Sequence, residues 1–259
     1  MPQTIVQVEN LNLAYKSVHA VRNVSFSVEP GEILAVIGQN GSGKTSTVEC
    51  VEGLRRPDNG LIRVFGKDPW LQRGEVYKEM GVQLQETEYF AKIRVEELCR
   101  LFASFYERPA DWNLLLAQLG LDEKRKRPVH KLSGGEKQRL SILLSLMGRP
   151  RLLILDELTT GLDPEVRQNM WASFENIRKS GVSVIMVSHY LDEVEALADK
   201  ILYLEKGAQK FWGTQQGFRE YAKSQVPREE WEKNKDLSLE KLYLMLAPKT
   251  AGLTLEGII

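Results

Sequence analysis

The sequence contains few cysteines and shows no excess of either charge. Its two cysteines, Cys50 and Cys99, are too few and too far apart for a zinc site or a disulfide framework, so we expect both to be packed in the interior. The 35 basic and 35 acidic side chains cancel, which leaves no long-range field for capturing nucleic acid or anionic lipid. We therefore interpret the basic stretch at 123–127 as a solvated loop and not as a nucleic-acid surface.

Long hydrophobic runs are also absent. No apolar stretch approaches the roughly 18 to 20 residues that a membrane span requires, and the first residues carry neither the basic nor the apolar region of an export signal. We therefore expect a cytoplasmic chain. Its 259 residues are enough to bury a sizeable core without metal or disulfide support.

The hydrophobic residues that are present follow two patterns. Apolar and polar residues alternate over 5–15 and 24–28, which predicts antiparallel strands with one solvated face. The runs at 33–37, 152–155 and 182–187 are continuously apolar, as in parallel strands covered on both faces. Helical stretches follow these runs, so the fold is predicted to be α/β around a parallel sheet. Ligands of such sheets bind beyond the carboxyl ends of the strands.

The remaining segments are predicted to be helical. Between about 87 and 148 the β pattern disappears and apolar residues take helical spacing, which indicates an inserted helical subdomain. After about 213 the chain becomes polar, and 237–246 is predicted to be an amphipathic helix without evident chemistry. The predicted organisation is a domain at 1–213 followed by a helical C-terminal extension at 214–259.

The most specific motif is the octapeptide at 38–45, which fits the phosphate-loop pattern G-x-x-x-x-G-K-[ST] between a buried strand and a helix. Its glycines let successive N–H groups point at a phosphate, Lys44 adds a positive charge, and Thr45 offers a hydroxyl to Mg²⁺. We therefore expect this segment to bind ATP. The predicted phosphate-loop residues are Gly38, Gln39, Asn40, Gly41, Ser42, Gly43, Lys44, Thr45 and Ser46.

Two carboxylates, Asp156 and Glu157, end the second buried run. Asp156 is positioned to hold Mg²⁺, directly or through water, and Glu157 lies one residue further toward the γ-phosphate, where a base or a water-orienting group is needed. Phosphoryl transfer requires mainly positioning and neutralisation of charge from the protein. The pair is therefore predicted to be catalytic.

The segment at 133–136 is predicted to start a helix. Ser133 and Glu136 form a capping box, and a good helical sequence follows. Gly134 and Gly135 are unexpected there, because each costs about 1 kcal/mol of helix propensity relative to alanine. Bare N–H groups at a positive helix end are, however, open to an approaching phosphate.

Taken together, these motifs resemble the ATP-binding subunits of ATP-binding cassette (ABC) transporters, and the resemblance covers about residues 4–213. It implies a P-loop NTPase core with a parallel sheet, an antiparallel β-subdomain and the inserted helical subdomain. It also implies that two subunits pair head to tail, so that Ser133, Gly134, Gly135 and Glu136 of one close over the ATP held by the phosphate loop of the other.

The resemblance assigns four more positions. Tyr15 matches the aromatic residue that stacks on adenine, and His189 matches the histidine that contacts the γ-phosphate. Gln85 matches the glutamine that senses Mg²⁺ and the attacking water, with Gln83 as the rival. Asp163 matches the segment that crosses the dimer interface.

The sequence departs from the family pattern at Leu158 and Glu136. Leu158 replaces a common proline, so a fixed φ is lost but no catalytic group is. Glu136 replaces a common glutamine, which improves the capping box but places a carboxylate close to the bound phosphate.

Softer similarity, at 81–85, 188–195 and 237–242, points to the ATPases of two-component bacterial exporters. These ATPases drive a separate integral membrane subunit that exports drugs, antimicrobial peptides or lipid-like compounds. The expected place of the chain is then peripheral, on the inner face of the cell membrane. A soluble non-transport ABC ATPase and an importer ATPase are the alternatives; the absence of tandem cassettes and long coiled coils argues against the former.

Overall fold

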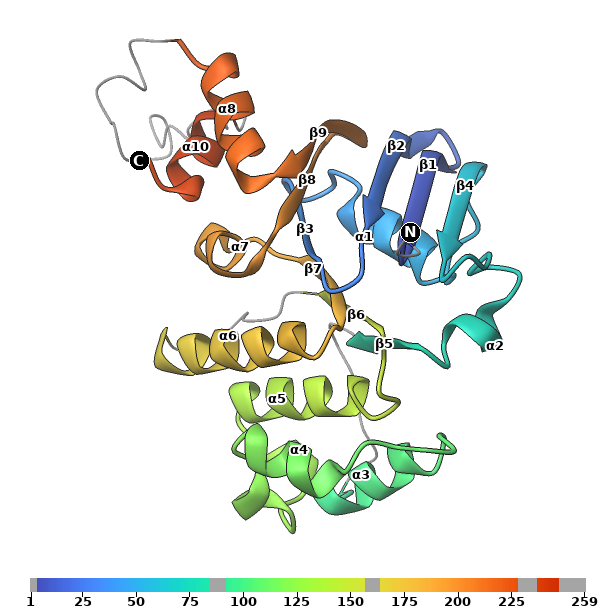
Figure 1. Cartoon of the computed structure of the whole chain (residues 1–259), viewed down its shortest axis with the longest axis vertical. Coiled ribbons are helices and arrows are strands. Elements are labelled where there is room, and N and C mark those ends of the chain that lie inside the picture. Colours follow the sequence, from blue (N-terminus) through green and yellow to red (C-terminus); the bar gives the residue numbers. More distant parts are fainter. Residues whose placement is uncertain (1–3, 84–91, 157–163, 228–236, 247–259) are drawn as a thin grey trace, which may run out of the picture.

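The computed structural model describes residues 4–83, 92–156, 164–227 and 237–246. Its strands form one nine-stranded sheet in the order β4-β1-β2-β9-β8-β3-β7-β6-β5 (Figure 1). The strands are β1 (Val6–Tyr15), β2 (Val18–Val28), β3 (Ile33–Ile37), β4 (Asn59–Val64), β5 (Met80–Gln83), β6 (Leu152–Asp156), β7 (Ser183–Val187), β8 (Lys200–Glu205) and β9 (Ala208–Thr214).

The antiparallel edge of the sheet consists of β1, β2 and β4. Strand β1 pairs antiparallel with both neighbours, and buried residues recur along β1 and β2 between exposed ones. Alternating patterns produce this arrangement because successive side chains of a strand point to opposite faces. The predicted antiparallel strands with one solvated face are confirmed.

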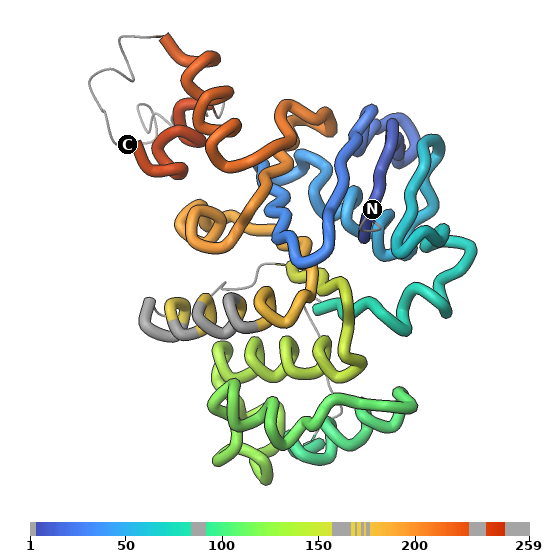
Figure 2. Tube along the Cα trace, in the orientation of Figure 1, coloured from blue at the N-terminus to red at the C-terminus, as the bar shows by residue number. Residues whose placement is uncertain are grey.

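The centre of the sheet is parallel. Strand β3 lies between β7 and β8, and β6 lies between β5 and β7, all in parallel pairs. Figure 2 shows this in colour, with blue β3 placed among strands from much later in the chain. Every residue of β3 and β7 is buried, which explains their continuous apolar sequence.

Helices cover both faces of the parallel strands. Ile33, Ala35 and Ile37 belong to the larger apolar core, while Leu34 and Val36 belong to a second core that includes residues of α1. The helices of the described segments are α1 (Lys44–Val51), α2 (Arg73–Val76), α3 (Val95–Ala103), α4 (Trp112–Gln118), α5 (Gly134–Ser145), α6 (Pro164–Lys179), α7 (Leu191–Leu197), α8 (Gln215–Gln225) and α10 (Leu239–Leu246), with short 3₁₀ turns at Asp122–Lys124 and Val129–Lys131.

The segment between β5 and β6 is helical where it is described. It contributes α3, α4 and α5, which lie together at one end of the molecule (Figure 1). Leu98, Leu116 and Leu140, one from each helix, are fully buried. The helices predicted here from the helical spacing of apolar residues are therefore confirmed.

Strands β8 and β9 were not anticipated from the sequence. They pair with each other antiparallel, and β8 pairs with β3 so that Tyr203 lies opposite Ile37. Helices α8 and α10 follow them, and α10 contacts both α8 and α7. The last described part of the chain is thus packed against the centre of the sheet.

Both cysteines are buried, as predicted. Burial raises the pKa of the Cys50 and Cys99 thiols to about 12, so neither forms a reactive thiolate near neutral pH. They act as small packing residues. Among the described helices, none combines the length and apolar character needed to cross a bilayer.

Candidate active site

The phosphate loop leaves the carboxyl end of β3 and enters α1. Gly38, Gly41 and Gly43 all have positive φ angles, of 151°, 75° and 98°. A side chain is disfavoured in these conformations, whereas glycine adopts them readily. The loop is closed by Ser42, whose N–H donates to the carbonyl of Gln39 at 3.1 Å. The loop geometry therefore follows directly from the positions of its glycines.

Two glycines of the loop also allow close backbone contacts. A Cβ on Gly43 would lie 2.4 Å from the carbonyl oxygen of Ala20, and one on Gly38 would lie 2.3 Å from that of Leu204. Both distances are far below van der Waals contact. The loop is thus wedged between β2 and β8, and this packing fixes its shape.

Lys44 is held inside the loop that it follows. Its Nζ donates to the carbonyl oxygens of Gly38 at 2.8 Å and Gln39 at 3.0 Å, and the residue is buried. The first N–H groups of α1 are not capped by a side chain, because the N-cap is Gly43. Uncapped N–H groups, the positive helix end and a fixed ammonium together form an anion site.

A cavity of about 560 Å³ opens in front of this loop. It is also lined by Asp156, from the end of β6, and by His189, which follows β7. Parallel strands bring these residues together because their carboxyl ends lie at one edge of the sheet. The lining residues are Val18, His19, Ala20, Asn40, Gly41, Gly43, Lys44, Thr45, Ser46, Asp156, Val187 and His189.

The oxygen donors of the cavity suit a hard divalent cation. The Thr45 hydroxyl and the Asp156 carboxylate share this wall, and Mg²⁺ prefers such ligands. The Gln83 amide is buried beside them: its Nε2 lies 3.5 Å from the Asp156 carbonyl oxygen, and its Oε1 has no hydrogen-bond partner in the described structure. Asp156 and Thr45 are therefore in place for the predicted metal site, and Gln83 lies next to it.

His189 is presented by a rigid turn between β7 and α7. The Ser188 hydroxyl donates to the buried Glu193 carboxylate and accepts the N–H of Tyr190 at 3.0 Å. The histidine itself is exposed in the cavity wall. Buried contacts on both sides of His189 therefore hold the backbone that carries it.

Tyr15 lies beside the phosphate-loop helix but outside the residues that line the cavity. Its hydroxyl is 3.2 Å from the Ser46 Oγ, and the Arg55 guanidinium lies 5.1 Å from its ring centroid. The wall on this side is formed by Val18, His19 and Ala20, which the sequence analysis did not identify. Val18 is apolar yet 64% exposed, which only the structure shows.

Ser133 caps α5 as the sequence predicted. Its Oγ accepts the N–H of Glu136 at 3.2 Å, and the Glu136 carboxylate accepts the Ser133 N–H at 2.8 Å. Lys124 pairs with the same carboxylate at 3.1 Å. The Ser133 N–H and then Lys124 hold the pKa of Glu136 below its usual value. The carboxylate that departs from the family pattern is thus engaged within its own chain.

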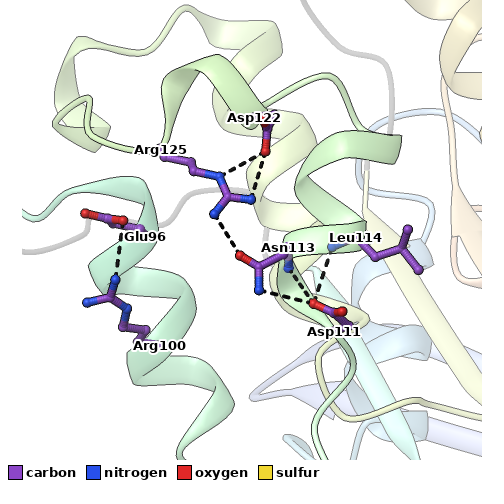
Figure 3. A network of polar contacts seen from close by, with 7 residues as sticks. All are labelled: Glu96, Arg100, Asp111, Asn113, Leu114, Asp122 and Arg125. Carbon is purple, nitrogen blue, oxygen red and sulfur yellow. Dashed lines mark hydrogen bonds and ion pairs between the residues drawn. The ribbon is translucent and has the colours of Figure 1, made fainter.

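The basic stretch near α5 is tied to neighbouring helices (Figure 3). Arg125 pairs with Asp122 at 2.8 Å and donates to the Asn113 side chain at 2.7 Å, and Asp111 caps α4 by accepting the Asn113 N–H. With Lys124 paired to Glu136, two of the basic side chains have structural partners. The stretch was interpreted as a solvated loop; the structure differs in that it begins in a 3₁₀ turn and that Lys124 and Arg125 are bound to neighbouring elements.

Of the signature residues 133–136, none lines the cavity in front of the phosphate loop. Within the part of the chain that the structure describes, a Cβ on Gly134 would have no neighbour within 4 Å. Gln85, Glu157, Leu158 and Asp163 lie outside the described residues, so their predicted roles stay predictions. One chain therefore brings together the phosphate loop, Asp156 and His189, without the signature.

Three known proteins similar to this chain are ATP-binding proteins named for resistance, export and import. The linearmycin resistance ATP-binding protein LnrL of Bacillus subtilis is 32% identical over 81% of this chain and 69% of its own length. The Nod factor export ATP-binding protein I of Ralstonia nicotianae is 31% identical over 78% and 65%. The methionine import ATP-binding protein MetN of Bordetella pertussis is 32% identical over 78% and 60%. The chain thus spans somewhat under two thirds of the last two relatives.

Solved structures agree with the fold. An ATP-binding subunit of an ABC transporter superposes with a TM-score of 0.80 at 25% identity, covering 94% of this chain and 99% of that one. A dimeric bacterial ABC transporter cassette gives 0.73 at 22% identity, over 81% and 98%, which supports the fold alone. The sequence profile of the ABC transporter family matches residues 21–160. The chain therefore belongs to the ABC transporter family, as one of its nucleotide-binding ATPase subunits.

Proposed function

We propose that two copies of this chain pair head to tail and drive a separate membrane subunit by ATP hydrolysis, exporting drugs, antimicrobial peptides or lipid-like compounds. The pairing is supported by one observation: in a single chain the signature residues lie apart from the cavity that the phosphate loop lines. The cavity unites the phosphate loop with Asp156 and His189, while Ser133 starts a helix that does not line it. A second copy would supply the missing wall.

In this proposal the phosphate loop holds the β- and γ-phosphates. Its N–H groups and Lys44 compensate phosphate charge, and Tyr15 stacks on the adenine. Thr45 and Asp156 would hold Mg²⁺, together with Gln85 or its rival Gln83. Bound Mg²⁺ would neutralise charge that develops on the transferred phosphoryl group.

The catalytic steps are assigned to groups at the strand ends. Glu157 orients the attacking water and accepts its proton, and His189 contacts the γ-phosphate. Gln85 would report the presence of metal and water to the membrane subunit. The exposure of His189 in the cavity wall supports its place in this scheme.

The second copy is proposed to close the site. The exposed Ser133 and the glycines after it offer N–H groups at a helix start to the γ-phosphate of the partner's ATP. The open space beside Gly134 supports this approach. Asp163 would cross the interface between the two copies.

Export is supported by two relatives, one named for antibiotic resistance and one for export. The methionine import protein is similarly identical, so an importer is the competing assignment. In either case the chain would sit at the inner face of the cell membrane, beside an integral membrane partner.

The head-to-tail pair is tested by complementation. Lys44→Ala removes the phosphate-binding ammonium, and Ser133→Arg fills the signature with a bulky cation; we expect each variant alone to be inactive. Mixed together, they form pairs with one intact site, so nucleotide trapping should return. Lys44→Ala mixed with itself at twice the concentration is the control. Failure of every mixture to trap nucleotide would contradict the pairing.

The catalytic role of Glu157 is tested by Glu157→Gln, with Glu123→Gln, an exposed carboxylate on another element, as the control. We expect normal ATP binding, hydrolysis slowed about 100-fold or more, and accumulation of an ATP-bound dimer. Turnover close to that of the control would remove Glu157 from the mechanism.

The transport role is tested by isolating the chain from detergent-solubilised membranes and identifying its partner. Reconstituted with that partner in inside-out vesicles, an exporter accumulates substrate in the lumen when ATP is added outside. Loss of preloaded substrate from the lumen would indicate an importer. Recovery of no membrane partner would favour a non-transport ATPase.

A further inference from the structure

A second, smaller cavity lies beside the phosphate loop, and the C-terminal helix α10 forms part of its wall. The cavity measures about 300 Å³ and is lined by Gly38, Gln39 and Asn40 of the loop and by Ser188 and His189 of the next strand end. Ile37, Leu191 and Tyr243 also line it. Among the described residues of the C-terminal extension, to which the sequence assigned no chemistry, Tyr243 is the one that lines this cavity.

Tyr243 reaches this position through a chain of aromatic contacts. Its ring packs edge-on against Tyr203, with centroids 5.8 Å apart, and Tyr203 pairs in register with Ile37, the last residue before the loop. Phe218 of α8 also packs edge-on against Tyr203, with ring centroids 6.0 Å apart. The extension is thus anchored at the base of the phosphate loop and not on a remote surface.

The same extension also binds α7, the helix that follows His189. Arg219 of α8 pairs with Glu195 of α7 and also donates to the carbonyl of Leu237 at 2.8 Å. The Glu195 carboxylate in turn accepts the N–H of Leu239 at 3.3 Å. Gln215 donates its amide to carbonyl oxygens at the end of α7, including that of Val194 at 3.1 Å. Helices α8 and α10 therefore hold the distal half of α7.

We propose that Tyr243 is a positioning residue for His189, so that the C-terminal helices set the rate of hydrolysis without taking part in nucleotide binding. The inference rests on the proposed role of His189. At the start of α7 the Ser188–Glu193 contact fixes the turn, and at its end α8 and α10 fix the helix. Tyr243 and His189 line the same small cavity, and the Tyr243 ring, which packs on Tyr203, limits how far His189 can move away from the γ-phosphate.

The size of the expected effect follows from geometry. A displacement of about 1 Å at a catalytic group can cost up to 100-fold in rate, so partial loss of support should cost about 10-fold. Affinity for ATP should stay within about twofold, because the phosphate-loop N–H groups and Lys44 supply binding. A general loss of folding would instead reduce both quantities together.

The experiment compares Tyr243→Ala with Tyr243→Phe in the full chain. We expect Tyr243→Ala to lower kcat about 10-fold with unchanged affinity for a non-hydrolysable ATP analogue, and Tyr243→Phe, which keeps the ring, to restore kcat. Leu244→Ala is the matched control, since the adjacent Leu244 is 62% exposed on the same helix. Thermal unfolding of each variant is measured alongside.

Two further variants separate this inference from the proposed function. If His189→Ala keeps normal turnover, the role of His189 is wrong; if it lowers turnover but Tyr243→Ala does not, only the positioning role is wrong. In the His189→Ala background, Tyr243→Ala should have no additional effect, because both act through one group. An additive loss, or an equal loss in Leu244→Ala, would overturn the inference.

Should Tyr243→Ala fail to fold, Glu195→Gln provides the second test. It removes the ion pair with Arg219 but keeps an acceptor for the Leu239 N–H. We expect a smaller fall in kcat, about threefold, again without loss of ATP affinity. Unchanged kcat in this variant would contradict coupling through α7.

Discussion

Helices α1 and α5 both begin beside glycines, but only α5 has a side-chain cap, on the N–H of Glu136. At α5 the Ser133 hydroxyl and the Glu136 carboxylate complete a capping box. At α1 the N-cap is Gly43 in a left-handed conformation, with no side-chain cap. The start of α1 therefore depends on groups outside its own side chains to satisfy its first N–H groups, whereas the start of α5 is stabilised by its capping box.

The glycines at the two helix starts also differ in whether the backbone conformation and the surrounding atoms exclude a side chain. Gly38 and Gly43 have positive φ angles and backbone contacts that leave no room for a Cβ. Gly134 has neither: its φ is not positive, and a Cβ would meet no described residue within 4 Å. The fold of one chain therefore requires the loop glycines, but it does not require Gly134.

The largest effect is expected at Gly43. In Gly43→Ala the Cβ would collide with the Ala20 carbonyl and force a strained φ, costing about 1–3 kcal/mol for the backbone alone. We expect nucleotide affinity to fall about 100-fold or more as the loop shifts, measured with a fluorescent ATP analogue. Gly74→Ala, at a glycine with open space, is the control. Equal affinity in the two variants would show that the loop tolerates a side chain.

A different outcome is expected at Gly134. Gly134→Ala should fold normally and gain about 0.4–1 kcal/mol of stability, since alanine fits the helix. ATP turnover should nevertheless fall about 10- to 100-fold if the partner's phosphate needs the bare backbone. Chemical denaturation and steady-state hydrolysis measure the two quantities. Normal turnover in Gly134→Ala would mean that the glycine serves neither the fold nor the site.

This contrast explains how much the sequence could predict. The phosphate loop and the capping box are local patterns, and their geometry follows from residues close together in the chain. Asp156 and His189 were placed with the loop because the carboxyl ends of parallel strands share an edge. The placement of Asp156 and His189 needed only the direction of the strands, without knowledge of the detailed packing.

The residues that the sequence missed depend on distant pairings. Tyr203 lies opposite Ile37 only because β8 pairs with β3, and Tyr243 reaches the loop only by packing on Tyr203. The wall at Val18 and His19 depends likewise on how β2 approaches the loop. Hydrophobic periodicity carries no information on such register, so the links between the C-terminal helices and the site emerged only from the structure.

The smallest expected effect is a pH dependence of stability that arises from Glu52, at the C-terminal end of α1. Glu52 caps this end and is 6% exposed, and burial, followed by the carboxylates of Glu49 and Asp156, raises its pKa to about 8. Between about pH 5 and pH 8 the folded chain therefore holds a proton that the unfolded chain has lost. Stability contributed by this proton is complete below the unfolded pKa and declines as the pH rises through the folded one.

Glu52→Gln should remove this dependence because the amide stays neutral. We expect the variant and the native chain to be similarly stable near pH 5, and the Tm of the variant to exceed that of the native chain by a margin that grows as the pH rises toward 8. Glu123→Gln, at an exposed carboxylate, should show no such divergence. If the Tm difference between Glu52→Gln and the native chain were constant with pH, Glu52 would be ionised in the folded state. Glu52 would then not lower the stability of the folded chain at the C-terminal end of α1. The difference between α1 and α5 would be confined to the glycines at their N-terminal ends.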